Sequence, residues 1–531
     1  MQHHVVDLLL SELHTLVCDL GRDGGLIGPS VYDTAQVIRL APPASGVQQT
    51  LSWLMAQQQP DGGWGNPAFP RARDLPTLAA LLALHMYALS APDRAVIHLG
   101  LAFLRNQASI WAGPLPEDLP VGIELLLPRL LDEAQAAGLS VPQTPYAALV
   151  ALGQQRLRLL ASIPARAGTP PAHVWEGWGR DPDTSLIDSS GGVGHSPAAT
   201  AAWLRASSGR AELAEARASA HRYLEQASAA TGVGIPGVVP TVWPIPRFEQ
   251  PFGLYMLLAG GLLDHPLLRD AVRLQLDELS HALRPSGLGM SDWFTADGDD
   301  TAAALALLLA TGRLADPSIL LYFAHADHFR AYASELQPSL SVTAHAVHAL
   351  RLAGRPCDAA QRYILQRQLA DGRWPGDKWH SSWLYTTSQA VIALADSPHA
   401  DVLSRAADAL LSHQHPGGGW GDDDASAEGT AYGVLALRAL VRAKPAPCLQ
   451  QGLDRAERWL LECYRPLEHA GDTACWLGKQ NYLPRRIVRL LQLTATVPTT
   501  ALPASPQLSQ LIGGPGPLRY PAQQASELAL G

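Results

Sequence analysis

A loop rich in glycine and tryptophan recurs between segments rich in alanine and leucine, and this repeat limits the possible folds more than any other feature. It reads QQPDGGWG ending at Gly65, QLADGRW ending at Trp374 and QHPGGGWG ending at Gly421, with degenerate copies near Gly192 and Gly287. Glycine permits the positive φ angles of a tight turn between helices, and tryptophan fills the seam between neighbouring hairpins. The repeats therefore predict stacked helical hairpins.

The segments after these loops have small residues along one face, which lets helices pack closely around a ring. Alanine and leucine dominate, and 42 prolines and 46 glycines divide the chain into short pieces. This composition predicts an all-α fold of α/α barrels. A chain of 531 residues is too long for one ordinary core, so two barrel domains are the simplest arrangement. Independent glycine-rich surface turns are the alternative.

Charge and hydropathy exclude several classes of partner. The formal net charge of -9 includes no basic stripe that would follow a nucleic acid. The apolar runs are shorter than the roughly 20 residues of a transmembrane helix. The N-terminal segment lacks the basic region and cleavage site of a signal peptide. The five cysteines lie far apart and fit reduced thiols. We therefore expect a cytoplasmic protein with a small-molecule partner and no integral membrane segment.

Three carboxylates, Asp297, Asp299 and Asp300, directly precede a strong helix-forming run. Carboxylates this close cannot all ionise easily, so at least one pKa should rise. A neutral aspartic acid in a dry cavity can protonate an unactivated alkene. We take Asp299 as this acid, with Asp297 and Asp300 holding its geometry. A solvated helix cap and a divalent-ion loop are the alternatives, although the spacing does not match an EF-hand.

Further motifs follow one another in the order found in a known family. They are GPSVYDTAQVIRL, LSWLMAQQQPDGGWG, EDLPVGIELLLPRLLDEAQAAGL, GVVPTVWPIPRFEQPFGLYML, DGDDTA, WPGDKWHSSWLYTTS, GWGDDDASAEGTAY and CWLGKQNYLPRRIVRLL. Over nearly its whole length the sequence resembles the bacterial class II diterpene cyclases, which include copalyl and halimadienyl diphosphate synthases. Gln36 and Ile123 depart from the family's usual aromatic residues at these positions.

The resemblance implies a βγ architecture with a cavity between two α/α barrels. Residues 1–25 would form the first helix of the β domain, and residues 26–240 the inserted γ domain. Residues 241–495 would complete the β domain and carry the D-x-D-D motif. Residues 496–531 would form an irregular C-terminal extension.

The resemblance also implies that Asp299, the third position of D-x-D-D, is the catalytic acid. A residue on a neighbouring helix would tune it through a hydrogen bond, and Thr343 and His345 are the candidates. Each has an alternative role as a satisfied polar group in the core. Aromatic residues would stabilise the carbocation, with core packing as the alternative. The candidates in the matching motifs are Trp293, Trp379, Trp383 and Tyr385.

The family's substrates carry a diphosphate that is bound without being ionised, usually with Mg²⁺. Asp118 and Glu124 match the acidic positions associated with this metal, which takes hard oxygen ligands. Arg156, Lys378 and Lys479 are the candidates for binding the diphosphate. For each basic residue a structural salt bridge is the alternative.

The resemblance implies cyclisation of geranylgeranyl diphosphate to a bicyclic diphosphate of copalyl, halimadienyl or clerodane type. This is an EC 5.5.1-type reaction of an intramolecular lyase or isomerase, and a homodimer is one expected assembly. Drimenyl diphosphate synthesis from farnesyl diphosphate is the main alternative. Squalene-hopene and meroterpenoid cyclases fit the motifs less well. A glycosidase would separate its carboxylates further, and a protein prenyltransferase would need a zinc site that we do not find.

Overall fold

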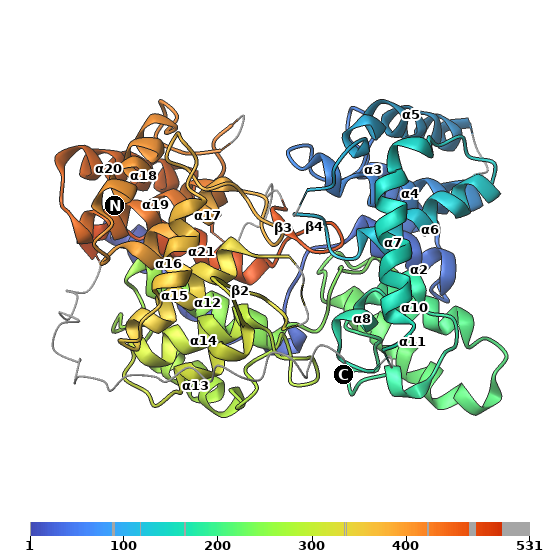
Figure 1. Ribbon diagram of the computed structural model, residues 1–531, viewed down its shortest axis with the longest axis horizontal. Coiled ribbons are helices and arrows are strands. Elements are labelled where there is room, and N and C mark those ends of the chain that lie inside the picture. The colour runs from blue at the N-terminus through green and yellow to red at the C-terminus, as the bar shows by residue number, and fades with distance from the viewer. Residues whose placement is uncertain are drawn as a thin grey trace.

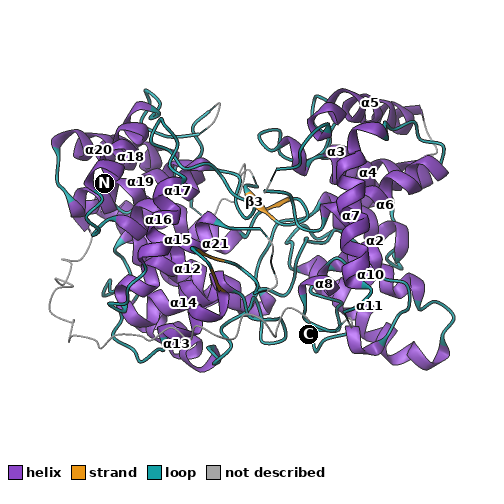
Figure 2. Cartoon of the chain, viewed as in Figure 1, coloured by secondary structure: helices purple, strands orange, loops and turns teal. Residues whose placement is uncertain are grey.

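Two helical barrels lie side by side in the computed structural model of the chain (Figure 1). The structure describes residues 2–501, except for 88–90, 117, 164–165, 334, 336, 422–423 and 467–473. Nearly all of the regular structure in this part is helical (Figure 2), so the all-α prediction is confirmed. The predicted C-terminal extension lies outside the described residues from position 502 onward.

The first barrel has an inner ring of helices in which each packs on the next and the last returns to the first. This ring consists of α2 (Val31–Leu40), α4 (Asp74–Tyr87), α6 (Ile123–Ala136), α9 (Trp175–Trp178) and α10 (Pro197–Ala206). The remaining helices of this barrel are α3 (Gln48–Ala56), α5 (Ala91–Gln107), α7 (Ala147–Leu160), α8 (Pro170–His173) and α11 (Ala214–Ala229). The inner helices are rich in buried alanine and leucine, as close packing around a ring requires.

The second barrel also closes, through α12 (Pro246–Gly260), α14 (Gly298–Ala310), α15 (Leu340–Leu352), α17 (Trp383–Leu394), α19 (Ala427–Ala443) and α21 (Arg485–Thr496). Its outer helices are α1 (Gln2–Asp19), α13 (Arg269–Ala282), α16 (Asp358–Gln366), α18 (Ala400–Ser412) and α20 (Pro447–Cys463). The N-terminal helix α1 packs on α13 and α21. The chain therefore starts in the second barrel, builds the first, and returns.

The tryptophan loops share one hydrogen-bond pattern. In each, the indole is fully buried and its Nε1 donates to a carbonyl of the preceding helix, at 2.7 to 2.8 Å. The backbone N–H of the same tryptophan donates to a threonine on the following inner helix, as Trp374 does to Thr387 at 3.1 Å. Gly372 turns the chain at φ 92°, where a Cβ would lie 2.2 Å from the Arg405 carbonyl oxygen. Glycine is therefore required there.

The threonine bond extends to loops that lack tryptophan. Val193, Leu288 and Phe329 each donate their backbone N–H to a threonine in the same way. Thr34 accepts the backbone N–H of Val239 in the same manner. We call all of the threonines that accept such a bond, in loops with and without tryptophan, the repeat threonines. They are Thr34, Thr77, Thr200, Thr301, Thr343, Thr387 and Thr430. Each bond joins the loop backbone to one position on an inner helix, so it sets the position of that helix along its own axis relative to the loop.

Two short hairpins interrupt the helical pattern. Strands β1 (Ala324–His325) and β2 (His328–Phe329) pair before α15, and β3 (Trp476–Leu477) pairs with β4 (Asn481–Tyr482) before α21. The β3–β4 hairpin lies between the two barrels (Figure 1). It bonds to both, because Leu477 N donates to Trp379 O and Val121 N donates to Gly478 O. This hairpin therefore connects the barrels.

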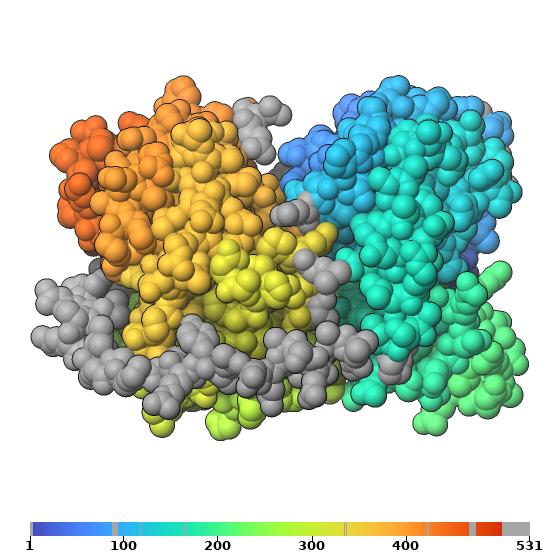
Figure 3. All heavy atoms as spheres, in the orientation of Figure 1, coloured from blue at the N-terminus to red at the C-terminus, as the bar shows by residue number. Residues whose placement is uncertain are grey.

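The barrels also meet directly on the face shown in space-filling representation (Figure 3). Thr295 N donates to Gly168 O at 2.7 Å, and His195 Nε2 lies 2.6 Å from Ser291 Oγ. Both contacts hold the segment just before Asp297. Among the helices that the structure describes, none combines the length and the apolar character needed to cross a bilayer.

Candidate active site

Asp297 caps the helix that carries the acidic motif. Its Oδ1 accepts the backbone N–H groups of Asp299 at 3.0 Å and Asp300 at 2.8 Å, so it satisfies two free donors at the start of α14. A nearly buried carboxylate in this position orients the next turn. Repeat threonine Thr301, four residues later, holds the same turn by donating to the Asp297 carbonyl at 2.5 Å.

Burial and mutual proximity raise the pKa values of two of the three aspartates. Burial raises the pKa of Asp297 to about 7, and the negative charge of Asp299 adds to the rise. Burial, followed by the neighbouring Asp297 and Asp299 charges, raises the pKa of Asp300 well above its usual range. The side-chain hydrogen bond between them lowers the pKa of Asp297 and raises that of Asp300. Burial and the two neighbouring carboxyl groups thus favour the protonated form of Asp300.

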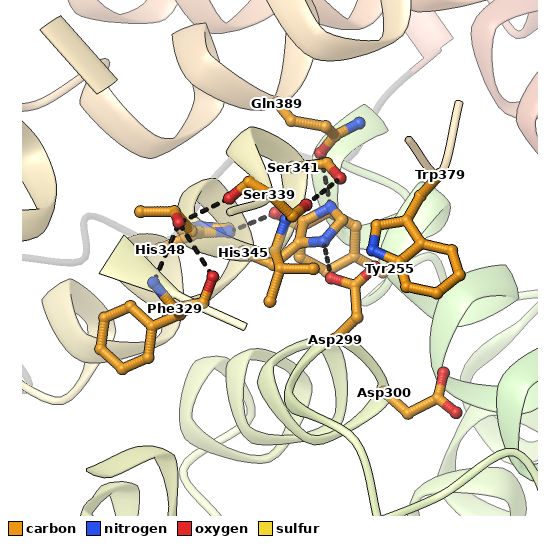
Figure 4. Close-up of polar contacts among 12 residues, drawn as sticks. Tyr255, Asp299, Asp300, Phe329, Ser339, Ser341, His345, His348, Trp379 and Gln389 are labelled. Carbon is orange, nitrogen blue, oxygen red and sulfur yellow. Dashed lines mark hydrogen bonds and ion pairs between the residues drawn. The ribbon is translucent and has the colours of Figure 1, made fainter. Parts of the chain in front are cut away.

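Asp299 points in a different direction from Asp300 (Figure 4). Its Oδ1 lies 2.6 Å from Nδ1 of His345 on α15, and its side chain keeps 15% of its surface exposed. His345 is fully buried, and its Nε2 lies 3.0 Å from Oε1 of Gln389 on α17. The three inner helices α14, α15 and α17 thus contribute one side chain each. Asp299 is the member that retains access to solvent.

Of the two candidates for tuning the acid, the structure pairs His345 with Asp299. The Thr343 hydroxyl donates instead to Ser339 O at 2.7 Å and accepts the N–H of Phe329 at 3.1 Å. Thr343 is therefore a repeat threonine that supports the barrel, and its hydroxyl is already occupied by the backbone.

Aromatic rings surround the pair. The His345 ring makes edge contacts with Phe252, at a centroid distance of 5.5 Å, and with Tyr255, at 5.0 Å. Trp476 of the β3–β4 hairpin packs 5.6 Å from Phe252 and 5.5 Å from Tyr385. We call Phe252, Tyr255, Tyr385 and Trp476 the aromatic wall. Its ring faces can stabilise a cation without offering a strong nucleophile.

The predicted aromatic residues differ in their positions. Tyr385 belongs to the aromatic wall, and its hydroxyl has no hydrogen-bond partner within the described part of the chain. Trp379 is partly buried against the same core. Trp293 is 46% exposed, and the Trp383 ring packs against His413 at 5.4 Å. The wall therefore does not include Trp293 or Trp383, and sequence reasoning missed Phe252, Tyr255 and Trp476 as members.

Lys479, which the resemblance assigned to the diphosphate, lies in an ion-pair cluster. Its ammonium is fully buried, 2.6 Å from Glu176 Oε1 and 3.7 Å from Asp33 Oδ1, and it also donates to Ser196 at 2.6 Å. These partners all belong to the first barrel, so Lys479 anchors the β3–β4 hairpin there. Lys479 would have to leave these partners before it could bind a diphosphate, so its assignment to the diphosphate stays a prediction.

Lys378 is also engaged within the protein. Its ammonium pairs with Glu335 and donates to Gln337 O at 3.1 Å. Burial lowers its pKa, although Glu335 opposes this shift. Lys378 would have to leave Glu335 before it could bind a diphosphate.

Glu124 and Arg156 face each other on α6 and α7 of the first barrel. Arg156 Nε lies 3.6 Å from Glu124 Oε1, and the two side chains keep 24% and 17% of their surfaces exposed. Burial raises the pKa of Glu124. Asp118 lies partly exposed in the loop before α6. Within the described residues, no group of three or more His, Cys, Asp or Glu side chains converges as metal ligands do. One or two carboxylates with substrate phosphates suffice for Mg²⁺.

Comparisons with known proteins identify the family of the chain. Residues 329–434 match the squalene-hopene cyclase C-terminal domain family. Over 516 residues the chain is 46% identical to the (+)-kolavenyl diphosphate synthase of Herpetosiphon aurantiacus, covering 93% of this chain and 98% of the relative. The chain belongs to the class II diterpene cyclases.

Two further comparisons place the cyclase in the same family. It is 31% identical over 504 residues to the type B diterpene cyclase of Mycobacterium tuberculosis, which covers 89% of this chain and 96% of the relative. The solved structure of ent-copalyl diphosphate synthase from Streptomyces platensis superposes with a TM-score of 0.76 at 30% identity, covering 92% of this chain and 99% of that chain. The predicted family and barrel fold are confirmed.

The raised pKa of Asp297 makes a testable contribution to the stability of the cyclase. Its folded-state pKa of about 7 lies above the ordinary value of 3.8, so the folded protein binds this proton more tightly than the unfolded chain does. The resulting stabilisation is complete below about pH 4 and is lost as the pH rises through about 7. Asparagine keeps the cap but does not titrate. We expect Asp297→Asn to gain thermal stability relative to the wild type as the pH rises from 5 to 8. Differential scanning calorimetry measures this, with the exposed Asp292→Asn as control; parallel curves for all three proteins would contradict the assignment.

Proposed function

We propose that this cyclase uses Asp299 to protonate the terminal alkene of geranylgeranyl diphosphate and then closes two rings while the diphosphate stays attached. The observation that carries the proposal is the Asp299–His345 pair beside the aromatic wall. Asp299 is the aspartate of the motif that keeps an exposed edge, whereas Asp297 and Asp300 are almost fully buried.

The reaction is an isomerisation, so every proton that enters the substrate leaves it again. Asp299 gives its proton to the terminal alkene carbon, and the electron pairs of the internal double bonds close the two rings in sequence. The positive charge moves along the carbon skeleton past ring faces such as those of Phe252 and Trp476. Loss of a proton from carbon ends the reaction. The Asp299 carboxylate left behind is stabilised by His345.

The diphosphate needs cations that can be reached from solvent, and Arg156 meets this condition. Its guanidinium is partly exposed beside Glu124, so we propose that Arg156 binds the diphosphate. Mg²⁺ held by Glu124, with Asp118 as a further candidate ligand, would neutralise part of the diphosphate charge. Lys378 could join them after release from Glu335.

Replacing Arg156 by glutamine should weaken ground-state binding and leave the chemical step intact. We expect KM for geranylgeranyl diphosphate to rise about tenfold with kcat nearly unchanged, because a contact equally strong in the ground and transition states affects KM alone. Calorimetric titration with inorganic diphosphate, with and without Mg²⁺, provides a readout independent of activity. Arg129→Gln, on the same barrel, is the control. A fall in kcat at unchanged KM would place Arg156 outside the diphosphate site.

Product analysis tests the proposed reaction. The cyclase is incubated with geranylgeranyl, farnesyl or squalene substrates and Mg²⁺, and the products are dephosphorylated and identified by mass spectrometry. We expect a bicyclic diterpene alcohol, for which kolavenol is the first standard to compare because of the Herpetosiphon relative. Turnover of squalene, or of farnesyl diphosphate in preference to the longer substrate, would overturn the proposal.

Two expectations from the sequence go with this function. The cyclase is expected to act in the cytoplasm and to form a homodimer. Cell fractionation and size-exclusion chromatography with light scattering are the respective tests.

A further inference from the structure

The repeat threonines align neighbouring inner helices. This alignment places Gln389, which was not predicted from the sequence, against His345, the partner of Asp299. His345 follows repeat threonine Thr343 by two positions, and Gln389 follows Thr387 by two positions. Because both threonines make the same loop bond, the two side chains lie at equivalent levels on neighbouring helices. They meet with His345 Nε2 3.0 Å from Gln389 Oε1.

The orientation of the Gln389 amide is set by its other contact. Ser388 Oγ donates its single proton to Tyr385 O at 2.8 Å. The same oxygen can then only accept, and it lies 3.2 Å from Gln389 Nε2. The amide nitrogen therefore faces Ser388 and the amide oxygen faces His345. Since an amide oxygen only accepts hydrogen bonds, His345 Nε2 must carry a proton.

A proton fixed on Nε2 leaves Nδ1 of His345 as the nitrogen that exchanges protons with Asp299. If the pair holds one exchangeable proton, it lies between Nδ1 and Asp299 Oδ1 and is not free for a substrate. If the pair holds two, the imidazolium donates from Nδ1 to Oδ1, and Oδ2 keeps a proton for transfer. The second state is the one that alkene protonation requires. It is favoured by a hydrogen-bond acceptor at Nε2.

We propose that Gln389 is a positioning residue that stabilises the imidazolium form of His345 and so directs the acidic proton of Asp299 to the substrate. The proposal rests on the proposed function, because it takes Asp299 as the acid. In the reaction Oδ2 of Asp299 loses its proton to the alkene carbon, and the imidazolium remains paired with the carboxylate. The proton released from the product restores the acid.

The other titratable groups facing His345 are neutral. Tyr255 on α12 and Tyr385 on α17 pack against its ring, and burial raises the pKa of both hydroxyls above the usual range. Burial lowers the pKa of His348 on the same helix to about 3. In the described part of the chain, Asp299 is thus the one acidic group in contact with His345, and Gln389 supplies the acceptor on the opposite side.

The pH dependence of kcat tests the role of Gln389. Activity needs the doubly protonated pair, so it should fall as the pH rises. Gln389→Leu removes the acceptor, and we expect a loss of about 10- to 100-fold in kcat with the alkaline limb moved about one unit to lower pH. Gln389→Glu provides a stronger acceptor and should move the same limb about one unit to higher pH. KM should stay unchanged in both.

Controls separate this role from a general loss of structure. Gln275→Leu removes another buried glutamine, whose hydrogen bonds within the described residues go to groups remote from the acid, and it should leave the pH profile unchanged. If Gln389→Leu does not fold, Gln389→Glu alone decides the question. Both variants keeping the wild-type limb, or shifting it in the same direction, would overturn the role of Gln389. With Asp299→Asn inactive in the same assay, the proposed function would still stand, whereas an active Asp299→Asn would overturn that function itself.

Discussion

Asp299→Asn should lower the rate of cyclisation by about 10⁴-fold or more, since it removes the proton that starts the reaction while preserving the size of the side chain. The asparagine amide can still hydrogen-bond His345, and Asp297 still caps α14. The fold and the binding of the diphosphate should therefore remain. Single-turnover assays with geranylgeranyl diphosphate measure the rate, and calorimetry measures substrate binding.

The matched control for this variant is Asp292→Asn. Asp292 lies on the same loop but is exposed and pairs with Arg247 at 3.1 Å, so its replacement should change the rate by less than about twofold. Cyclisation by Asp299→Asn at near the wild-type rate would exclude Asp299 as the acid. A variant that is inactive and also unable to bind substrate would show that Asp299 supports the site only through its structure.

The barrels could be predicted from local sequence because their turns need particular residues. Glycine at the turn and a following tryptophan make the loops recognisable in the sequence. In the structure the glycines turn the chain and the tryptophans are buried, as predicted. The repeat threonines were not recognised, because their distance from the loop varies. Trp374 and Thr387 are separated by 13 positions, but Trp420 and Thr430 by 10. Because the number of residues between the loop and its threonine is not constant, no regular repeat of threonine appears in the sequence.

The crowded aspartates were visible in the sequence, but which of the two candidates on the neighbouring helix pairs with Asp299 was not. Thr343 and His345 are two residues apart on one helix, so their side chains point about 200° apart and only one can face Asp299. The sequence does not give the rotation of α15 within the barrel. The bond from Phe329 to Thr343 supplies it. Gln389 was missed for the same reason, since its relation to His345 depends on the alignment of two helices.

Lys479 shows which contacts a sequence motif does not reveal. Its place in a family motif suggested that it binds the diphosphate, yet its partner Glu176 is 303 positions away in the sequence. Nothing in the sequence around Lys479 or Glu176 indicates that they pair. The pair forms because the β3–β4 hairpin contacts the first barrel. The structure gives Lys479 an anchoring contact between the barrels that the sequence does not predict.

Lys479→Met should lower the free energy of unfolding by about 3 to 5 kcal/mol, because it leaves two buried carboxylates without their cation. For a barrel of this size we expect the melting temperature to fall by about 10 °C. Burial raises the pKa of Asp33 to about 6 even though Lys479 lowers it. Without the lysine the pKa rises further, so the folded protein binds a proton more tightly. The loss of stability should therefore be smaller at pH 5 than at pH 8.

A second substitution separates anchoring from binding. Adding Glu176→Gln to Lys479→Met removes one of the two unpaired charges and should recover part of the lost melting temperature, because the amide is cheaper to bury than a carboxylate. Below the melting transition, KM for geranylgeranyl diphosphate should match the wild type in both variants. If Lys479 bound the diphosphate, Lys479→Met would instead raise KM with little change in melting temperature, and Glu176→Gln would restore nothing. The double variant thus tells an interdomain anchor from a substrate ligand through stability and affinity measured on the same protein.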